Sequence, residues 1–312
     1  MPKQNQPRKK KRTGLLHLAL PATSANLGPA FDAAALAMDF YLTISARPAA
    51  SFSITASGRD QEICQTVENH LILDTYCKIL QSEGAEIIPL LLRMKNEIPI
   101  GKGCGSSAAA RLAGIALANH FGRLGWSDAR IIGEAAHLEH HPDNASACWM
   151  GGLTVARMTA EREAQVVCIR PKGKWPLLLA IPEQALSTEE ARRALPAQYS
   201  LADAVANIQN SMLLLAAFIQ GRPDLLCSAL EDRLHQPYRA GLCPLLPALQ
   251  EMTGKPGVLG VALSGAGPSV LVFLDPRSNL RRTQGLIAAH IFRKGLRAEL
   301  LPASITPRGT RR

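Results

Sequence analysis

The sequence predicts a globular protein of 312 residues that mixes helices with strands. Hydrophobic residues make up 47% of the chain and charged residues 19%, which suits a protein with a buried core and excludes a disordered one. Short apolar segments with strand character recur along the chain, with longer helical segments between them. The length allows one large domain or two ordinary ones, and the charged, non-periodic stretch 157–164 suits a link between two.

Each expected element rests on its local pattern. Short apolar runs or alternation predict strands at 15–20, 40–47, 51–56, 89–94, 166–169, 177–181 and 298–301, and two more within 258–273. Helices are expected at 69–82, 108–121, 127–139, 187–195, 202–218, 223–231 and 284–292. Ser127 suits the N-cap of the third helix, and Ser187 opens a capping-type signature in the fourth.

The net charge of +10 is concentrated at the two ends of the chain. Residues 1–14 hold six lysines and arginines, residues 304–312 hold three arginines, and neither end has an acidic residue. The body between them therefore carries about +1, which gives no support for a specific nucleic-acid partner. Both ends are expected to be flexible, solvated tails.

The cysteines and the apolar runs indicate a cytoplasmic protein. Seven cysteines show neither a C-x-x-C pair nor metal-ligand spacing, so reduced thiols are expected. The basic N-terminus has no apolar segment behind it, so no signal peptide is expected. The longest apolar runs, such as 212–219, are too short to span a membrane, and no membrane partner is expected.

A glycine-rich loop separates the expected strand 89–94 from the expected helix 108–121. Its residues are Pro99, Ile100, Gly101, Lys102, Gly103, Cys104, Gly105, Ser106 and Ser107. Glycine lets the backbone approach a ligand closely, and the start of a helix presents free N–H groups and the positive end of its dipole. These features predict a phosphate site, with the serines as further donors or as an oxygen ligand for Mg²⁺. The alternative is a plain glycine turn with Ser106 as an N-cap.

Two further polar segments each allow a structural and a functional interpretation. Residues 21–32 combine small residues with Asn26 and end at Asp32, so they form either a specific tight loop or an ordinary turn capped by Asp32. The expected helix that ends at Glu139 continues into His-His-Pro-Asp-Asn at 140–144. That segment is either a functional cluster or a polar helix end stopped by proline. A zinc site is weaker, because no third ligand follows at a suitable spacing.

In order along the chain, these segments resemble motifs of the GHMP kinases and of their homoserine kinase branch. The glycine-rich loop resembles Pro-x-x-x-Gly-Leu-Gly-Ser-Ser-Ala, residues 21–32 resemble Pro-x-Thr-x-Ala-Asn-Leu-Gly-x-Gly-Phe-Asp, and residues 139–144 resemble Glu-Gly-His-Pro-Asp-Asn. Residues 187–196 and 235–239 resemble the two arginine-containing strings of the branch. Ser-Gly-Ala-Gly-Pro at 264–268 resembles the third family motif.

The resemblance covers residues 15–302 and implies an α+β fold with the two-domain GHMP kinase architecture. Residues 15–164 would form the N-terminal, ATP-binding domain, and residues 165–303 a ferredoxin-like C-terminal domain. The implied activity is ATP-dependent phosphorylation of L-homoserine to O-phospho-L-homoserine, on the way to threonine. ATP and the substrate would meet between the domains.

The resemblance also implies roles for the matching residues. ATP would contact the loop from Pro99 to Ser107 and either Asn69 or His70. Mg²⁺ would be held by Ser107 and Glu134. Asp143 and Asn144 would orient the reacting hydroxyl, with Asp143 too weak a base for outright proton abstraction. The substrate would contact Asn26, Asp32, His141, Thr188, Arg192, Arg239 and Gly265. The two arginines would hold its carboxylate, because a planar guanidinium suits bidentate recognition.

Three residues depart from the family pattern. Ala30 and His140 each replace a glycine, and Cys104 replaces leucine or methionine. If residue 30 needs a positive φ, alanine strains the loop there. These departures leave open a non-catalytic nucleotide-binding or sensor member, and the arginines leave open another GHMP kinase whose substrate bears a carboxylate. The sequence also leaves a homodimer open.

Overall fold

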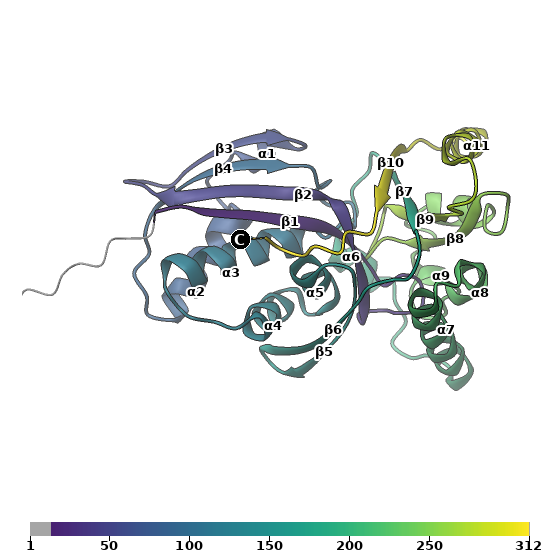
Figure 1. Cartoon of the computed structure of the whole chain (residues 1–312), viewed down its shortest axis with the longest axis horizontal. Coiled ribbons are helices and arrows are strands. Elements are labelled where there is room, and N and C mark those ends of the chain that lie inside the picture. The colour runs from purple at the N-terminus through teal and green to yellow at the C-terminus, as the bar shows by residue number, and fades with distance from the viewer. Residues whose placement is uncertain (1–13, 312) are drawn as a thin grey trace, which may run out of the picture.

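The structure, a computed structural model, describes residues 14–311 and consists of two α+β domains side by side (Figure 1). Each domain is built on one sheet, of six strands in the N-terminal domain and four in the C-terminal domain. The predicted α+β class and two-domain architecture are confirmed. The tail expected over residues 1–14 lies outside the described residues, except for Gly14.

The N-terminal sheet is organised around the long strand β2. Its strands are β1 (Leu16–Ala25), β2 (Ala34–Pro48), β3 (Ser53–Gly58), β4 (Leu90–Asn96), β5 (Leu153–Ala160) and β6 (Glu163–Ile169). β1 pairs with β2 along one edge, while β4 and β5 pair with different parts of its other edge. β3 lies beyond β4 and β6 lies beyond β5, so β2 connects two otherwise separate strand pairs.

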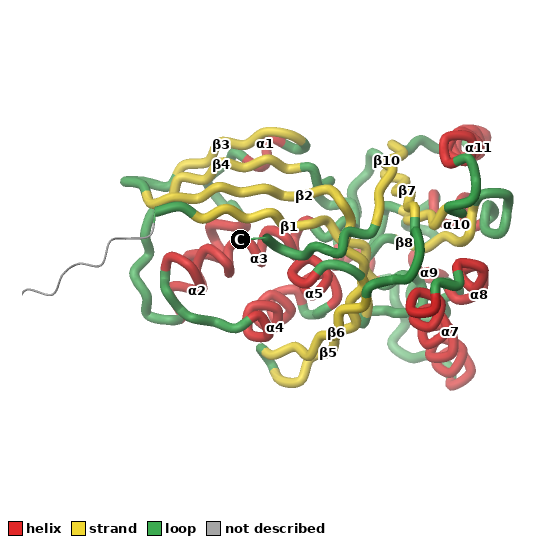
Figure 2. The backbone as a smooth tube through the Cα atoms, viewed as in Figure 1, coloured by secondary structure: helices red, strands yellow, loops and turns green. Residues whose placement is uncertain are grey.

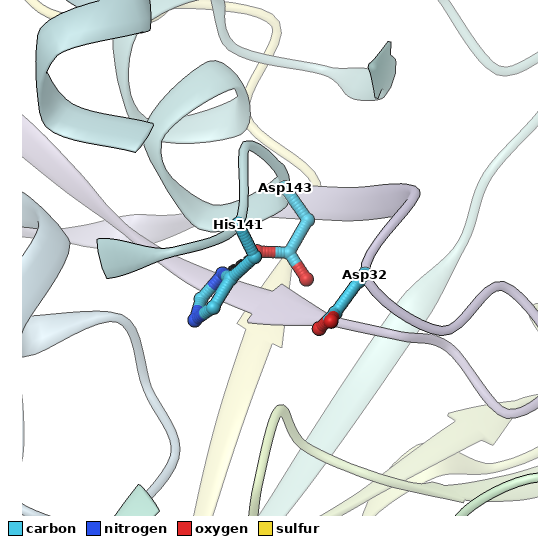
Figure 3. Close-up of side chains that lie close together, drawn as sticks. All are labelled: Asp32, His141 and Asp143. Carbon is cyan, nitrogen blue, oxygen red and sulfur yellow. Dashed lines mark hydrogen bonds and ion pairs between the residues drawn. The ribbon is translucent and has the colours of Figure 1, made fainter. Parts of the chain in front are cut away.

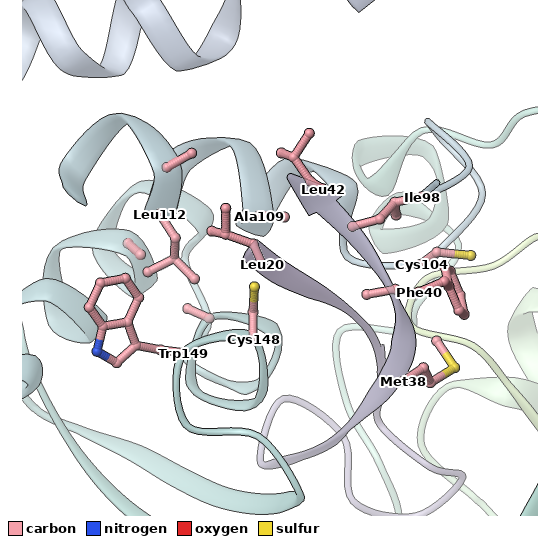
Figure 4. Close-up of a cluster of buried hydrophobic side chains, with 14 of the residues drawn as sticks. Leu20, Met38, Phe40, Leu42, Ile98, Cys104, Ala109, Leu112, Cys148 and Trp149 are labelled. Atoms are coloured by element: carbon pink, nitrogen blue, oxygen red, sulfur yellow. The ribbon is translucent and has the colours of Figure 1, made fainter. Parts of the chain in front are cut away.

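Helices cover one face of this sheet (Figure 1). They are α2 (Leu71–Ser82), α3 (Ser106–Phe121), α4 (Asp128–Glu139) and α5 (Asp143–Met150), with the short α1 (Gln61–Cys64) beside β3. α3 is alanine-rich and contacts the other three large helices, because its small side chains allow close approach. Figure 4 shows the resulting core, in which Leu20 and Leu42 of the sheet share a cluster with Leu112 of α3 and Trp149 of α5.

The C-terminal domain has the predicted ferredoxin-like topology. Its strands are β7 (Pro176–Ile181), β8 (Val258–Leu263), β9 (Val270–Leu274) and β10 (Glu299–Ser304). They form an antiparallel sheet in the order β10-β7-β9-β8. Its helices are α6 (Thr188–Arg193), α7 (Leu201–Gln220), the 3₁₀ turn η1 (Pro223–Leu225), α8 (Leu226–Ala229), α9 (Gln236–Arg239), α10 (Leu245–Gln250) and α11 (Leu280–Arg293). The chain thus runs strand, helices, two strands, helix, strand.

The expected link between the domains is wrong. Residues 157–164 are not a linker, because β5 and β6 form an antiparallel hairpin in the N-terminal sheet (Figure 2). The N-terminal domain therefore runs to Ile169, beyond the expected boundary at 164 and 165. The hairpin lies at the end of the sheet, where exposed positions carry polar residues and weaken the apolar pattern that marks a strand.

The last described residues return to the N-terminal domain. We call residues 305–311 the C-terminal strap. They follow β10 and form the yellow segment that runs back toward the N-terminal domain in Figure 1. Ile305 bridges to Met38, and Arg311 and Ala19 exchange two backbone hydrogen bonds of 3.1 Å. The expectation of a flexible tail over residues 304–312 is therefore wrong for residues 304–311, because backbone pairing fixes them.

The C-terminal strap also secures the end of α5. Thr310 donates from its backbone N–H to the Trp149 carbonyl and from its hydroxyl to the Cys148 carbonyl, each at 3.0 Å. Gly309 lies so close to the Trp149 carbonyl that a β-carbon there would overlap it. The other end of α5 begins at Asp143, so the strap supports a helix that reaches the site described below.

Removal of the C-terminal strap should destabilise the protein. Deleting residues 305–312 should lower the Tm by about 5 °C or more, because several hydrogen bonds worth about 1 kcal/mol each are lost. Gly309→Ala should lower it in the same direction, since a β-carbon has no room. Gly241→Ala is the matched control, because no atom lies within 4 Å of its added β-carbon. Scanning calorimetry measures all three, and an unchanged Tm in the deletion variant would show that the strap does not stabilise the fold.

Candidate active site

A cavity of about 740 Å³ lies between the two domains. Its walls come from the loop after β1, the glycine-rich loop before α3, the start of α5, and the loop between β8 and β9. α6 and α9 of the C-terminal domain add Arg192 and Arg239. The segments that the sequence singles out are therefore brought together in one place.

The glycine-rich loop has the backbone of an anion cradle. Gly101, Gly103 and Gly105 all have φ near +70°, a conformation that favours glycine. A β-carbon at Gly103 would overlap the carbonyl oxygen of Ser264, and one at Gly105 would overlap the Thr23 hydroxyl. No side chain caps the start of α3, whose N-cap is Gly105, so the alternative of Ser106 as an N-cap is wrong. Gly105 and the first residues of this helix, 106–108, line the cavity, and the first N–H groups of a helix have no partner within it.

Backbone hydrogen bonds and short side chains lock three loops together. The Thr23 N–H donates to the Cys104 carbonyl at 3.0 Å, and the Ser264 hydroxyl donates to the Gly103 carbonyl at 2.8 Å. Asn26 donates from its side-chain amide to the Gly265 carbonyl at 2.8 Å. Asn26 therefore holds the loop after β1 against the loop between β8 and β9, which places it as a structural tie at the edge of the cavity.

Ser107 meets a carboxylate other than the expected one. Its hydroxyl donates to Glu139 Oε1 at 2.7 Å, and Arg111 Nε lies 2.5 Å from the same oxygen. Glu134, the residue expected beside Ser107, is buried and pairs instead with Arg130 at 3.3 Å and with Arg162. The expectation that Glu134 lies beside Ser107 is wrong: Glu139 does, because the two carboxylates project from different sides of α4.

Asp32, His141 and Asp143 form a compact polar group in the cavity wall (Figure 3). His141 Nδ1 lies 2.6 Å from Asp143 Oδ1. Burial acts to lower the pKa of His141, but Asp143, Asp32 and Glu139 outweigh it and raise that pKa above its usual value. Burial, followed by the charge of Asp143, raises the pKa of Asp32 against the opposing effect of Arg192.

The ligand atoms of these three side chains lie within 4.8 Å of one another, a spacing that a metal ion would also fit. Arg192 argues for a different ligand, since its guanidinium reaches both carboxylate oxygens of Asp32, at 3.0 and 2.9 Å. Asn144 completes the cluster by accepting a 2.6 Å hydrogen bond from the Thr23 hydroxyl. The arrangement suits polar groups of an organic ligand better than a second cation beside an arginine.

Two arginines and an aromatic ring line the C-terminal side of the cavity. Arg239 is buried, and its Nε donates to the Ala191 carbonyl at 3.0 Å. The guanidinium carbons of Arg192 and Arg239 lie 5.7 and 5.4 Å from the centre of the Phe31 ring. Burial, and then the nearby charge of Arg192, lowers the pKa of Arg239. We call Phe31, Asp32, Arg192 and Arg239 the charged pocket, which suits a ligand carrying both a carboxylate and an ammonium group.

The remaining expected residues divide into two groups. Thr188, Gly265, Ile100 and Cys104 line the cavity, as do Asn69 and His70. Of that last pair, His70 is the N-cap of α2, and Asn69 directly precedes it. Pro99 and Lys102 do not line it: they face a separate groove, where the Lys102 ammonium donates to the Glu183 carbonyl. That bond holds Lys102 on the outer side of the loop.

The departures from the family pattern have structural explanations. Ala30 is not among the described residues with positive φ, so the alanine causes no strain of that kind. His140 does have a positive φ, of 67°, and it is exposed at the end of α4. Cys104 is buried, where burial raises the pKa of its thiol to about 12 and keeps it protonated. None of the three blocks the cavity.

Comparisons with known proteins match this geometry. The family model of the GHMP kinases N terminal domain matches residues 70–152, and the model of the GHMP kinases C terminal matches residues 214–284. A homoserine kinase from Solibacter usitatus (strain Ellin6076) is 42% identical over 296 residues, which are 94% of this chain and 95% of that protein. The chain belongs to the homoserine kinase branch of the GHMP kinases.

Further relatives agree with this membership. A homoserine kinase from Desulfitobacterium hafniense (strain DSM 10664 / DCB-2) is 34% identical and covers 95% of this chain and 99% of that protein. The crystal structure of a homoserine kinase from Cytophaga hutchinsonii shares the fold, with a TM-score of 0.80 at 21% identity, covering 97% of this chain and 98% of that one. Membership of a kinase family implies that this GHMP kinase uses ATP and a small-molecule substrate.

Sequence reasoning missed three residues of the site. Glu139 stands in a quoted family string, so the signal was present, but the metal role was given to its neighbour in the same helix. Phe31 precedes Asp32 and stands in the string of residues 21–32, which resembles a family motif and could have indicated it. His235 opens the second arginine string and lies behind Arg239, where only the folded chain shows its contacts.

Proposed function

We propose that this GHMP kinase transfers the terminal phosphoryl group of ATP to the hydroxyl of L-homoserine, giving O-phospho-L-homoserine on the way to threonine. The charged pocket is the observation that carries the proposal, because it places a carboxylate beside two guanidiniums. Asp32 would hold the ammonium group, and Arg192 and Arg239 the carboxylate. The substrate hydroxyl would then point toward Asp143 and the glycine-rich loop, which line the same cavity.

The residues of the glycine-rich loop fit a triphosphate. The space where β-carbons would lie at Gly103 and Gly105 is filled by neighbouring loops, and the start of α3 offers uncapped N–H groups. Ser107 and Glu139 fit Mg²⁺, since a hydroxyl and a carboxylate oxygen already lie within 2.7 Å of each other. When bound, Mg²⁺ would neutralise charge on the phosphate oxygens.

The chain's own groups would mainly orient the reactants. Asp143 Oδ1 receives hydrogen bonds from the Asn144 N–H at 2.5 Å and from the His141 ring, which fix the direction of the carboxylate. We therefore assign Asp143 and Asn144 to holding the substrate hydroxyl in line for attack. Phosphoryl transfer of this kind depends on positioning and charge neutralisation more than on a strong base.

A coupled ADP-release assay tests the proposal. The panel consists of homoserine, threonine, serine, mevalonate and galactose, each with ATP and Mg²⁺. Homoserine should give the highest kcat/KM, because only it combines both charged groups with a hydroxyl at the required distance. Preference for mevalonate would indicate another carboxylate-bearing substrate, and nucleotide binding without turnover of any compound would indicate a sensor. Either result would refute the proposed reaction.

Ser107 and Ser106 should differ sharply in their effect on turnover. Ser107→Ala removes the hydroxyl beside Glu139 and should reduce kcat by about 100-fold, while the protein folds normally. High Mg²⁺ should restore part of the loss, because weaker metal binding is offset by mass action. Ser106→Ala is the matched control and should lose less activity. Equal effects in the two variants, at every Mg²⁺ concentration, would remove Ser107 from the metal site.

We also propose that the enzyme is a cytoplasmic homodimer. All seven cysteines are free thiols, which fits a reducing compartment and is checked by cell fractionation. The dimer proposal rests on α7, whose residues Leu201, Val205, Ile208, Met212 and Ile219 are between 43% and 81% exposed. Their alternating spacing of three and four residues, with the half-buried Leu215 between the last two, is that of a helix-pairing seam.

A second copy of α7 is the partner that this seam fits best. Asp203 is the one ionisable residue in the helix, so the seam matches an equally uncharged surface. An antiparallel pair about 30 Å long aligns the helix dipoles favourably and approaches the roughly 1,000 Å² expected of a specific interface. By length and composition alone α7 also meets the criterion for a membrane span, the one helix among residues 14–311 to do so, with 22% of that window buried.

Light scattering measures the mass of the protein in solution. The unaltered chain should be a dimer, and Met212→Glu should be a monomer with unchanged fold, because a charge in the seam has no partner. Gln250→Glu adds the same charge to an exposed position on α10, outside the seam, and should remain dimeric. A monomeric unaltered chain, or one that binds lipid vesicles through α7, would refute the proposed interface.

A further inference from the structure

His235 lies behind the charged pocket without lining the cavity. Its side chain is 0% exposed, in the turn that leads into α9, four residues before Arg239. It touches elements of both domains, since it contacts the loop after β1 on one side and Arg239 on the other. A buried polar ring at such a junction is stable only if both of its nitrogens have partners.

The partners of His235 fix which nitrogen carries the hydrogen. Nε2 lies 2.8 Å from the carbonyl oxygen of Gly28, which only accepts, so Nε2 is the donor. Nδ1 is then an acceptor, and the Nη1 atom of Arg239 donates to it at 3.3 Å. One neutral ring thus joins a backbone carbonyl of the N-terminal domain to a guanidinium of the C-terminal domain.

The surroundings keep this ring neutral. Burial, helped by the positive charge of Arg239 and opposed by Asp232, lowers the pKa of His235 to about 4. The Asp232 carboxylate lies 3.4 Å from Nε2, but it also accepts from the backbone N–H groups of Leu234, His235 and Gln236. Those three bonds hold Asp232 to the turn, so the turn is rigid as well as the ring.

His235 also supports the aromatic floor of the charged pocket. Its ring stacks on Phe31 with 5.2 Å between ring centroids and an interplanar angle of 26°. Phe31 in turn lies under both guanidiniums and directly precedes Asp32 in the chain. The contacts of His235 therefore reach every member of the pocket, either directly or through one neighbour.

We propose that His235 is a positioning residue that holds Arg239 and the Gly28–Asp32 loop at a fixed spacing, and so sets the distance between the carboxylate and ammonium contacts for the substrate. The proposal deepens the proposed function and rests on it. A guanidinium that loses one of its three hydrogen-bond acceptors can rotate away from the carboxylate. The effect of His235 should therefore fall on the amino acid and spare the nucleotide, whose loop it does not touch.

Two substitutions separate positioning from simple packing. His235→Leu keeps most of the volume but removes both hydrogen bonds, and should raise the KM and the calorimetric Kd for homoserine about tenfold. The KM for ATP should change less than twofold. His235→Gln retains a donor and an acceptor and should recover most of the homoserine affinity. If the leucine variant does not fold, His235→Asn replaces it: its shorter side chain cannot reach both Gly28 and Arg239, so it should show the same selective loss of homoserine affinity.

A double-mutant cycle tests whether His235 acts through Arg239. In an Arg239→Lys background, which lacks the guanidinium N–H groups, changing His235 to Gln or Leu should alter homoserine affinity less than twofold. His290→Gln is the matched control, because its ring also donates to a backbone carbonyl, of Ala248 at 2.9 Å, far from the pocket. This control should leave the homoserine KM unchanged.

Three results would overturn the positioning role. These are an unchanged homoserine Kd in His235→Leu, an equal loss of ATP affinity, and a full effect of His235 that persists beside Arg239→Lys. Any of them is compatible with an unaltered enzyme that phosphorylates homoserine, so the proposed function would stand. If the unaltered enzyme binds no homoserine in the calorimeter, the proposed function fails first, and with it the role assigned to His235.

Discussion

The active site depends on how closely the glycine-rich loop approaches two other segments at Gly103 and Gly105. A side chain at Gly103 would overlap Ser264, in the loop between β8 and β9, and one at Gly105 would overlap Thr23, near the end of β1. The glycine-rich loop and β1 belong to the N-terminal domain, and Ser264 belongs to the C-terminal domain. The same contacts therefore shape the glycine-rich loop and join the domains, so both ends of the cavity share one framework.

The charged pocket places two positive charges, Arg192 and Arg239, close to each other. Arg239 is buried close to Arg192, and both burial and that second charge lower its pKa. The lowered pKa means that both effects disfavour the charged form of Arg239. Arg192 already contacts Asp32, whereas Arg239 donates to the carbonyl of Ala191. A ligand carboxylate would relieve the repulsion, because it supplies an anion close to Arg239. Binding of a carboxylate would thus offset the unfavourable interaction between the two arginines in the folded protein.

Short motifs, most of them at helix ends, carry most of what the sequence predicts about the site. Asp32, Ser107, Asp143, Arg192 and Arg239 each belong to a recognisable string, and the fold gathers all of them around one cavity. The choice between Glu134 and Glu139 depends on packing, because both lie in one expected helix, although only Glu139 stands in a family string. Five residues of helix turn the second carboxylate by about 140° from the first, and only packing decides which one faces α3.

Long-range pairing accounts for the other failures. The sequence pattern predicted a charged linker where β5 and β6 form a hairpin, and a tail where the C-terminal strap lies. Both errors arise because a strand at an exposed edge shows little apolar pattern. Lys102 likewise appears to belong to the phosphate loop until the Glu183 carbonyl is placed beside it. The strap and Lys102 have partners many residues away, and the hairpin joins the sheet through the pairing of β5 with the distant β2. No local rule identifies these partners.

The C-terminal strap has a mechanical consequence. The chain crosses from one domain to the other twice, once after β6 and again after β10, so two covalent connections run between the domains. Two covalent connections restrict the relative rotation of two bodies more than one connection does. Rotation of one domain against the other is therefore restrained at both crossings, in addition to the hydrogen bond between Ser264 and the Gly103 carbonyl.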